Sequence, residues 1–114
     1  MTQTLHVLLV EDSADDAALL LRELERGGYA PEHERVYTLP GLHAALLRRP
    51  WDVIFADYSM PGFSGTRALA LVRELGRDTP FIFVSGTMGE EIAVEAMRAG
   101  AQDYLMKGNL KRLL

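Results

Sequence analysis

The sequence predicts a doubly wound α/β domain, in which a five-stranded parallel sheet with the flavodoxin-like strand order 2-1-3-4-5 is covered by helices on both faces. Short apolar segments of strand length alternate with segments whose apolar residues recur at helical spacing. Glycine or proline residues lie at most of the junctions between these segments. Strands that alternate with helices in this way form parallel sheets through right-handed crossovers.

The first predicted elements are a buried strand and an amphipathic helix. Residues 5–10 are almost all apolar, as in a strand that is covered on both faces. Ser13 is the expected N-cap of the helix, and Asp15 and Asp16 fall in its first turn, where the helix dipole favours negative charge. Gly27-Gly28 ends this helix, whose apolar stripe comprises Ala17, Leu20, Leu21 and Leu24.

A weak strand, a short helix and a second buried strand follow. The strand near residues 32–37 is polar, so we expect it at an edge of the sheet. Pro40 lies in the first turn of the short helix, and Pro50 ends it. The apolar residues 53–56 then form a buried strand that ends at Asp57.

The same alternation continues through the second half of the chain. Pro61, Gly62 and Gly65 indicate a loop. The remaining elements are, in order, a helix with its apolar stripe within 68–75, a strand at 81–84 that ends at Ser85, a helix at 89–98 and a strand at 103–106 that ends at Lys107.

Composition and charge exclude several classes of protein. With 12 basic and 16 acidic residues the formal net charge is −4, and no basic stripe is present, which argues against direct nucleic-acid binding. No apolar run approaches the length of about 20 residues that a membrane helix requires, and the N-terminus lacks the features of a signal peptide. Cysteine is absent, which excludes disulfides and thiolate metal sites, so we expect a cytoplasmic protein without membrane contact.

Polar residues follow the predicted strands at the sheet edge where open α/β folds bind ligands. The predicted strand order brings Glu11, Asp12 and Asp57 into one pocket, which Ser85 and Lys107 flank. At about 5 Å and an effective dielectric constant near 20, each pair of like charges costs roughly 3 kcal/mol, so one carboxyl group must hold a proton or a cation must bind. A hard divalent cation suits these oxygen ligands, and we expect Mg²⁺, or Mn²⁺ in its place.

This combination of groups is typical of phosphoryl transfer. Asp57 is the candidate nucleophile that forms an acyl phosphate. Lys107 and the cation would neutralise charge on the phosphoryl oxygens, while Ser85 would donate a hydrogen bond to one of them. Each residue alone has an ordinary explanation as a turn residue, a helix-start residue or a solvated charge. Their predicted convergence from four strand ends favours the functional interpretation.

Four motifs contain these residues: Val10-Glu11-Asp12, Asp57-Tyr58-Ser59-Met60-Pro61-Gly62, Phe83-Val84-Ser85-Gly86 and Asp103-Tyr104-Leu105-Met106-Lys107. The separations are 28 residues from Asp57 to Ser85 and 22 residues from Ser85 to Lys107. In these motifs and spacings the chain resembles the receiver domain of bacterial two-component response regulators, over essentially its whole length. Any one motif is weak evidence, whereas the set is specific.

The resemblance implies a metal-dependent phosphorylation. Asp12, Asp57 and the backbone carbonyl of Ser59 would hold Mg²⁺, with Glu11 acting through water. In a phosphorelay, the phosphohistidine of a sensor histidine kinase or of a histidine phosphotransfer protein would donate the phosphoryl group to Asp57. Such a domain catalyses only its own phosphorylation and dephosphorylation, so we do not expect an enzyme that acts on external substrates.

The resemblance also implies a conformational switch. On phosphorylation Ser85 would move toward the phosphoryl group, and Tyr104 would rotate inward into the space that it vacates. This change would remodel a partner-binding surface on the fourth helix and the fifth strand. The side chains of Ser59 and Thr87 are expected to tune the lifetime of the phosphorylated state.

Two features depart from the family pattern. Family members usually carry proline after the lysine, where this chain has Gly108, and a cis bond before a non-proline residue costs about 2.5–4 kcal/mol, so we expect a trans bond. The sequence also ends at Leu114, which truncates the expected fifth helix. We therefore expect residues 1–114 to be a single domain of a longer protein. A homodimer or an exchange of elements would cover the apolar sheet face that this truncation leaves.

Three alternative functions have their own sequence requirements. A degenerate receiver that binds partners without phosphorylation would lack some of the chemical groups, which are all present here. A flavodoxin-like cofactor carrier would need a phosphate-binding loop where Glu11-Asp12 stands. A phosphatase with an aspartyl-phosphate intermediate would need a second aspartate at the position of Ser59.

Overall fold

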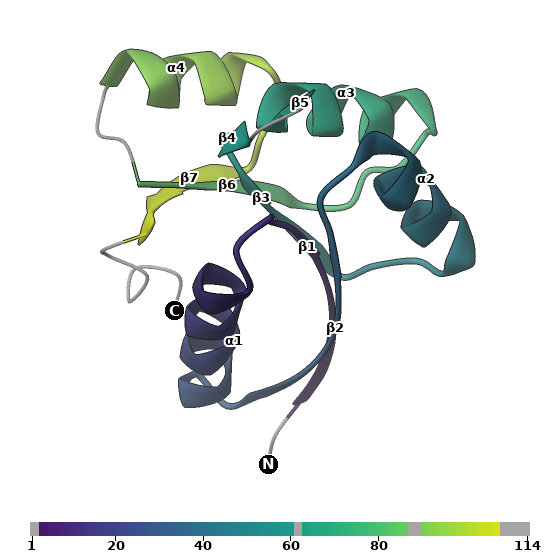
Figure 1. Ribbon diagram of the computed structural model, residues 1–114, viewed down its shortest axis with the longest axis vertical. Coiled ribbons are helices and arrows are strands. Elements are labelled where there is room, and N and C mark those ends of the chain that lie inside the picture. Colours follow the sequence, from purple (N-terminus) through teal and green to yellow (C-terminus); the bar gives the residue numbers. More distant parts are fainter. Residues whose placement is uncertain (1–2, 61–62, 87–89, 108–114) are drawn as a thin grey trace.

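A computed structural model describes residues 3–60, 63–86 and 90–107 of the chain. Its main sheet has five parallel strands in the order β2-β1-β3-β6-β7 (Figure 1), which confirms the predicted strand order. The strands of this sheet are β1 (Gln3–Val10), β2 (Tyr29–Val36), β3 (Val53–Asp57), β6 (Phe81–Ser85) and β7 (Asp103–Met106). The described helices are α1 (Ala14–Arg26), α2 (Leu39–Arg48), α3 (Gly65–Glu74) and α4 (Glu90–Arg98).

The sheet separates two hydrophobic clusters. Alternate residues of a strand point to opposite faces, so Leu8 and Ile54 lie in one cluster, whereas Leu9 and Phe55 lie in the other. Buried residues of α2, α3 and α4 complete the first cluster, and those of α1 complete the second. Figure 1 shows the same division, with α1 on one side of the sheet and α2, α3 and α4 on the other.

Side-chain caps determine where three of the helices begin. Ser13, Thr38 and Ser64 have extended backbone conformations, and each side chain accepts a hydrogen bond from the backbone amide three residues later. Each cap satisfies an amide that the helix itself leaves without a partner. The cap of α1 directly follows the acidic pair at the end of β1. The first turn of this helix therefore lies at the carboxyl edge of the sheet.

The structure differs from the predicted boundaries in two regions. β2 begins at Tyr29, earlier than its polar sequence indicated, because it pairs with β1 along its whole length; its predicted place at the sheet edge is confirmed. In the predicted loop after Asp57, β4 (Ser59–Met60) and β5 (Phe63–Ser64) pair antiparallel, and Gly65 is already the first residue of α3. A Cβ atom at Gly65 would lie 2.6 Å from the carbonyl oxygen of Asp57, so glycine permits this close approach.

Several predictions concern residues outside the described ranges. They are the truncated fifth helix in residues 108–114, the peptide bond between Lys107 and Gly108, and the position of Thr87. Among the helices that the structure does describe, none has the length and apolar character needed to cross a membrane.

Candidate functional site

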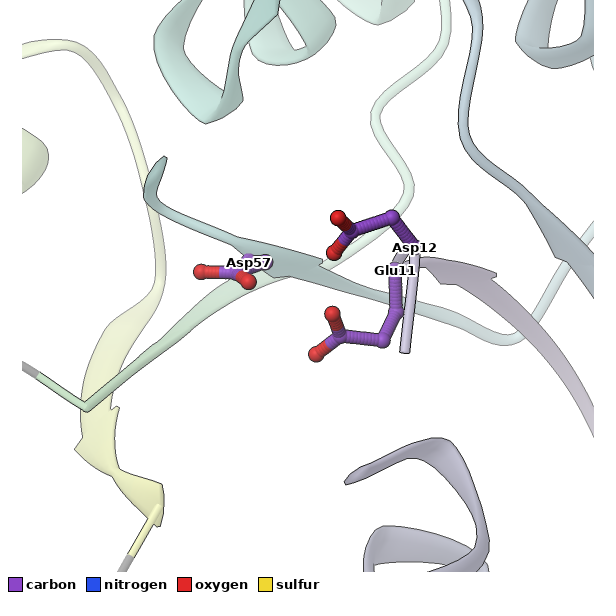
Figure 2. Close-up of side chains that lie close together, drawn as sticks. All are labelled: Glu11, Asp12 and Asp57. Carbon is purple, nitrogen blue, oxygen red and sulfur yellow. The ribbon is translucent and has the colours of Figure 1, made fainter. Parts of the chain in front are cut away.

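The predicted site residues converge at the carboxyl edge of the sheet. Glu11 and Asp12 follow β1, and Asp57 is the last residue of the neighbouring strand β3. The three side chains lie beside one another (Figure 2), and one carboxylate oxygen from each lies within 4.8 Å of those from the other two. Glu11 and Asp57 are buried, with 7% and 8% of their surface exposed, whereas Asp12 is exposed. The sequence therefore predicted this acidic cluster correctly.

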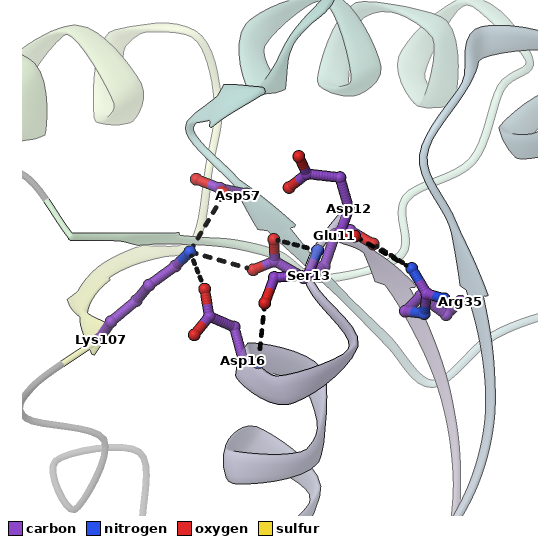
Figure 3. A network of polar contacts seen from close by, with 7 residues as sticks. All are labelled: Glu11, Asp12, Ser13, Asp16, Arg35, Asp57 and Lys107. Carbon is purple, nitrogen blue, oxygen red and sulfur yellow. Dashed lines mark hydrogen bonds and ion pairs between the residues drawn. The ribbon is translucent and has the colours of Figure 1, made fainter. Parts of the chain in front are cut away.

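Lys107 lies at the centre of a group of carboxylates (Figure 3). Its Nζ atom is 3.1 Å from Oδ2 of Asp57 and 3.2 Å from Oε1 of Glu11. Its contact with Oδ2 of Asp16, in the first turn of α1, is shorter still at 2.7 Å. The ammonium group, which follows β7, thus contacts both the junction between β1 and α1 and the carboxyl end of β3.

The environment shifts the pKa values of two of these groups. Burial, together with the charge of Asp57, raises the pKa of Glu11 to about 7, although the Ser13 amide and Lys107 act in the opposite direction. Burial lowers the pKa of Lys107, but its contacts with Asp16, Asp57 and Glu11 outweigh burial and raise that pKa overall. At neutral pH, Lys107 is therefore charged, and Glu11 is close to its titration midpoint.

The donor set of this cluster fits a hard divalent cation. Carboxylate oxygens, of which Mg²⁺ usually takes one or two together with waters, come here from Glu11, Asp12 and Asp57. Burial is the main cause of the raised pKa of Glu11, and the charge of Asp57 adds to it, while Lys107 lowers that pKa only in part. A bound cation would favour the ionised form of Glu11, which burial and the charge of Asp57 disfavour.

Two residues at the site, Asp16 and Arg35, were not predicted from the sequence to be site residues. Asp16 was assigned only to the favourable end of the helix dipole, yet its carboxylate contacts Lys107. Arg35, at the end of β2, donates from Nη1 to the backbone carbonyl oxygens of Glu11 and Asp12 at 3.2 and 3.4 Å. Both residues lie at the carboxyl edge of the predicted sheet, and this shared position is the sequence feature that could have identified them as site residues.

The structure also locates three other residues of the predicted site, Ser85, Tyr104 and Ser59. Ser85 is buried at the end of β6, directly after Val84, which pairs with Asp57. Tyr104 on β7 is also buried, and its ring lies edge-on to Tyr58 at 6.2 Å between centroids. Ser59 lies in β4, two residues after Asp57.

Comparison with protein families gives a match over almost the whole chain. Residues 7–114 match the family described as response regulator receiver domain. The chain is 31% identical over 104 residues to the phosphate regulon transcriptional regulatory protein PhoB of Klebsiella pneumoniae, covering 89% of this chain and 44% of that protein. It is 35% identical over 101 residues to the response regulator protein FleR of Pseudomonas aeruginosa, covering 89% of this chain and 21% of that protein. The chain thus spans less than half the length of these relatives.

A solved structure has a similar fold and a similar sequence. It is a response regulator protein from Burkholderia pseudomallei, described as containing a phosphorylated aspartic acid, a calcium ion and citrate. The TM-score is 0.78 at 26% identity, with 95% of this chain and 63% of that chain covered.

Proposed function

Because this chain belongs to the family of response regulator receiver domains, we propose that Asp57 accepts a phosphoryl group from a phosphohistidine of a partner protein. The observation that carries the proposal is the position of the Asp57 carboxylate. It is buried at a strand end, 3.1 Å from a lysine ammonium and within 4.8 Å of two further carboxylates. A carboxylate is a competent nucleophile for acyl-phosphate formation, and the ammonium group beside it would offset charge on an incoming phosphoryl group.

The transfer exchanges one bond to phosphorus for another. A carboxylate oxygen of Asp57 attacks the phosphorus atom and forms a new O–P bond. The P–N bond to the donor imidazole breaks, and its electron pair leaves with the ring nitrogen, which can then take up a proton. The product on this chain is an acyl phosphate at Asp57.

Other residues of the site would support this exchange. Lys107 would donate hydrogen bonds to the phosphoryl oxygens, and the hydroxyl of Ser85 would donate another. Asp12, Asp57 and the backbone carbonyl of Ser59 would hold Mg²⁺ or Mn²⁺, with Glu11 acting through water. When bound, the cation supplies positive charge that offsets the charge of the carboxylates and the phosphoryl group.

The related structure from Burkholderia pseudomallei supports the proposal. It is described as containing both a phosphorylated aspartic acid and a calcium ion, which is a hard divalent cation with oxygen ligands. The acidic cluster of this chain has the carboxylate oxygens that such a combination of nucleophile and divalent cation would need.

The proposed output is a change in a partner-binding surface. Ser85 would move toward the phosphoryl group, and Tyr104, already buried in this structure, would rotate further inward into the space that Ser85 vacates, which would alter the surface of α4 and β7. The side chains of Ser59 and Thr87 would tune the lifetime of the acyl phosphate. Ser85 and Tyr104 lie on adjacent, paired strands, and Ser85 is two residues after Phe83, the residue that pairs with Tyr104.

The proposed phosphoryl donor is a sensor histidine kinase or a histidine phosphotransfer protein in the cytoplasm. The formal net charge of −4 argues against nucleic acid as a direct partner of this segment. We also propose a homodimer in which a second copy covers apolar surface of the sheet. Light scattering across a concentration series would show a mass that rises toward twice the monomer; a monomer at every concentration would exclude the dimer.

Intact-mass measurement after incubation with acetyl phosphate tests the proposed chemistry. With Mg²⁺, the wild-type chain is expected to gain the mass of one phosphoryl group, and chelation should abolish that gain. Asp57→Asn is the matched control, because it removes the nucleophilic charge while keeping the size of the side chain. A folded wild-type protein that gains no mass with either Mg²⁺ or Mn²⁺ would instead support a degenerate receiver that binds partners without phosphorylation.

A further inference from the structure

The Asp16 carboxylate contacts Lys107, which lies outside the helix to which Asp16 belongs. Asp16 is three residues after the N-cap Ser13, the position from which an acidic side chain often reaches back to the N-cap amide. Here Glu11 Oε2 accepts a hydrogen bond from that amide at 3.2 Å instead. The Asp16 carboxylate turns to Lys107, while its own backbone amide donates to the Ser13 hydroxyl at 3.2 Å.

Asp16 differs from the other two carboxylates that contact Lys107. Glu11 and Asp57 also belong to the acidic cluster that fits a cation, whereas Asp16 does not. A cation in that cluster would compete with the ammonium group for oxygens of Glu11 and Asp57. Asp16 would then remain as the carboxylate that holds Lys107 near the nucleophile.

We propose that Asp16 is a positioning residue that keeps the Lys107 ammonium beside Asp57 when the cation site is filled. This inference rests on the proposed phosphoryl transfer, for which Lys107 must face the incoming phosphoryl oxygens. A lysine side chain has four flexible methylene groups, and holding it in place removes part of the entropic cost of aligning it for the reaction. Asp16 suits this purpose because its backbone is fixed in a capped helical turn, and both side chains line one cavity together with Asp57.

The magnitude of the effect follows from the exposure of the pair. The side chains of Lys107 and Asp16 are 25% and 35% exposed, so solvent screens their attraction in part. A partly screened ion pair of this kind corresponds to roughly a 1.5- to fivefold change in an equilibrium or rate constant. We expect Asp16→Asn to slow phosphorylation by acetyl phosphate at saturating Mg²⁺ within this range, without abolishing it.

Four comparisons separate positioning from a general effect of charge or folding. Asp15→Asn removes the same charge from the neighbouring, exposed position of the same helical turn and should leave the rate unchanged. Asp16→Glu restores a carboxylate and should recover part of the rate. In a Lys107→Met background, Asp16→Asn should have no further effect on the rate. Mg²⁺ affinity should be the same for Asp15→Asn and Asp16→Asn within about threefold, because neither residue belongs to the cation cluster.

A double-mutant cycle in urea unfolding provides a readout that does not depend on phosphorylation. The coupling between Asp16→Asn and Lys107→Met should persist when Mg²⁺ saturates the site, whereas the coupling between Asp57→Asn and Lys107→Met should fall. Loss of the Asp16 coupling in Mg²⁺, or a wild-type phosphorylation rate in Asp16→Asn, would overturn the inference. Absence of phosphorylation in the wild-type chain would instead refute the proposed function, and the unfolding cycle would still decide whether Asp16 holds Lys107.

Discussion

Glu11→Gln should remove most of the pH dependence of stability that the acidic cluster causes. In the folded chain the pKa of Glu11 is raised from 4.5 to about 7, chiefly by burial and then by the charge of Asp57. Between these two pH values the folded state binds more protons than the unfolded state, so the free energy of unfolding falls as pH rises. Above pH 7 both states are ionised, and the loss from this group is complete.

The size of the effect follows from the shift. A raised pKa is worth about 1.4 kcal/mol per unit, so the shift of Glu11 from 4.5 to about 7 corresponds to about 3 kcal/mol. Part of the pH range in which the folded and unfolded states bind different numbers of protons lies below pH 5. The free energy of unfolding should therefore change by about 2–3 kcal/mol between pH 5 and pH 8. Glutamine has nearly the same volume and keeps an oxygen that can accept the hydrogen bond from the Ser13 amide.

Urea unfolding in the presence of EDTA measures this difference. The stability of Glu11→Gln relative to wild type should rise by about 2–3 kcal/mol from pH 5 to pH 8. Glu25→Gln, on the exposed surface of α1, is the matched control and should parallel the wild type. If Glu11→Gln also parallels the wild type across this range, the buried carboxylate is not the source of the pH dependence, and the electrostatic description of the site is wrong.

Two further predictions test the framework of the site. Gly65→Ala places a Cβ atom 2.6 Å from both the Asp57 carbonyl oxygen and Phe83 Cε1, so this variant should have a lower urea midpoint and slower phosphorylation. Gly86→Ala is the control: its Cβ atom would have no neighbour closer than 3.9 Å, so it should fold with wild-type stability. Leu8→Ala removes a fully buried side chain and should cost about 2–5 kcal/mol in urea unfolding. Leu19→Ala, at a position that is 50% exposed, should cost less than about 1 kcal/mol, and equal costs for the two leucines would contradict the assigned core.

The main sheet and the acidic cluster could be predicted from the sequence because both follow from a simple pattern. Apolar strands that end in polar residues determine the sheet, and parallel strands place those ends at one edge. This reasoning placed Asp57 beside Glu11 and Asp12, and Lys107 beside Asp57, as the structure shows.

The contacts of Asp16 and Arg35 could not be predicted in the same way. Each depends on a side-chain direction that sequence spacing does not determine. Asp16 turns toward Lys107 because Glu11 already accepts the hydrogen bond from the Ser13 amide. Arg35 reaches the carbonyl oxygens of the acidic pair because β2 pairs in register with β1 up to Val36, and a polar edge strand gives only a weak signal of where it ends.

The sequence also contains only a weak indication of the short pair of strands after Asp57. β4 and β5 contain only two residues each, too few for an alternating pattern, and proline and glycine residues between them indicated a loop. The structure adds that this segment returns the chain to the sheet, where the Gly65 amide donates to the Tyr58 carbonyl oxygen at 3.1 Å.

Locating the phosphoryl group within the chain tests the central claim most directly. After incubation with acetyl phosphate and Mg²⁺, borohydride reduction converts an acyl phosphate to an alcohol, which peptide mass spectrometry can assign to one residue. We predict reduction at Asp57 alone, dependent on Mg²⁺ and absent from untreated protein. Reduction at Asp12 or Asp52, or a phosphoryl group on a serine, threonine or histidine side chain with Asp57 unmodified, would contradict the assignment of Asp57 as the acceptor.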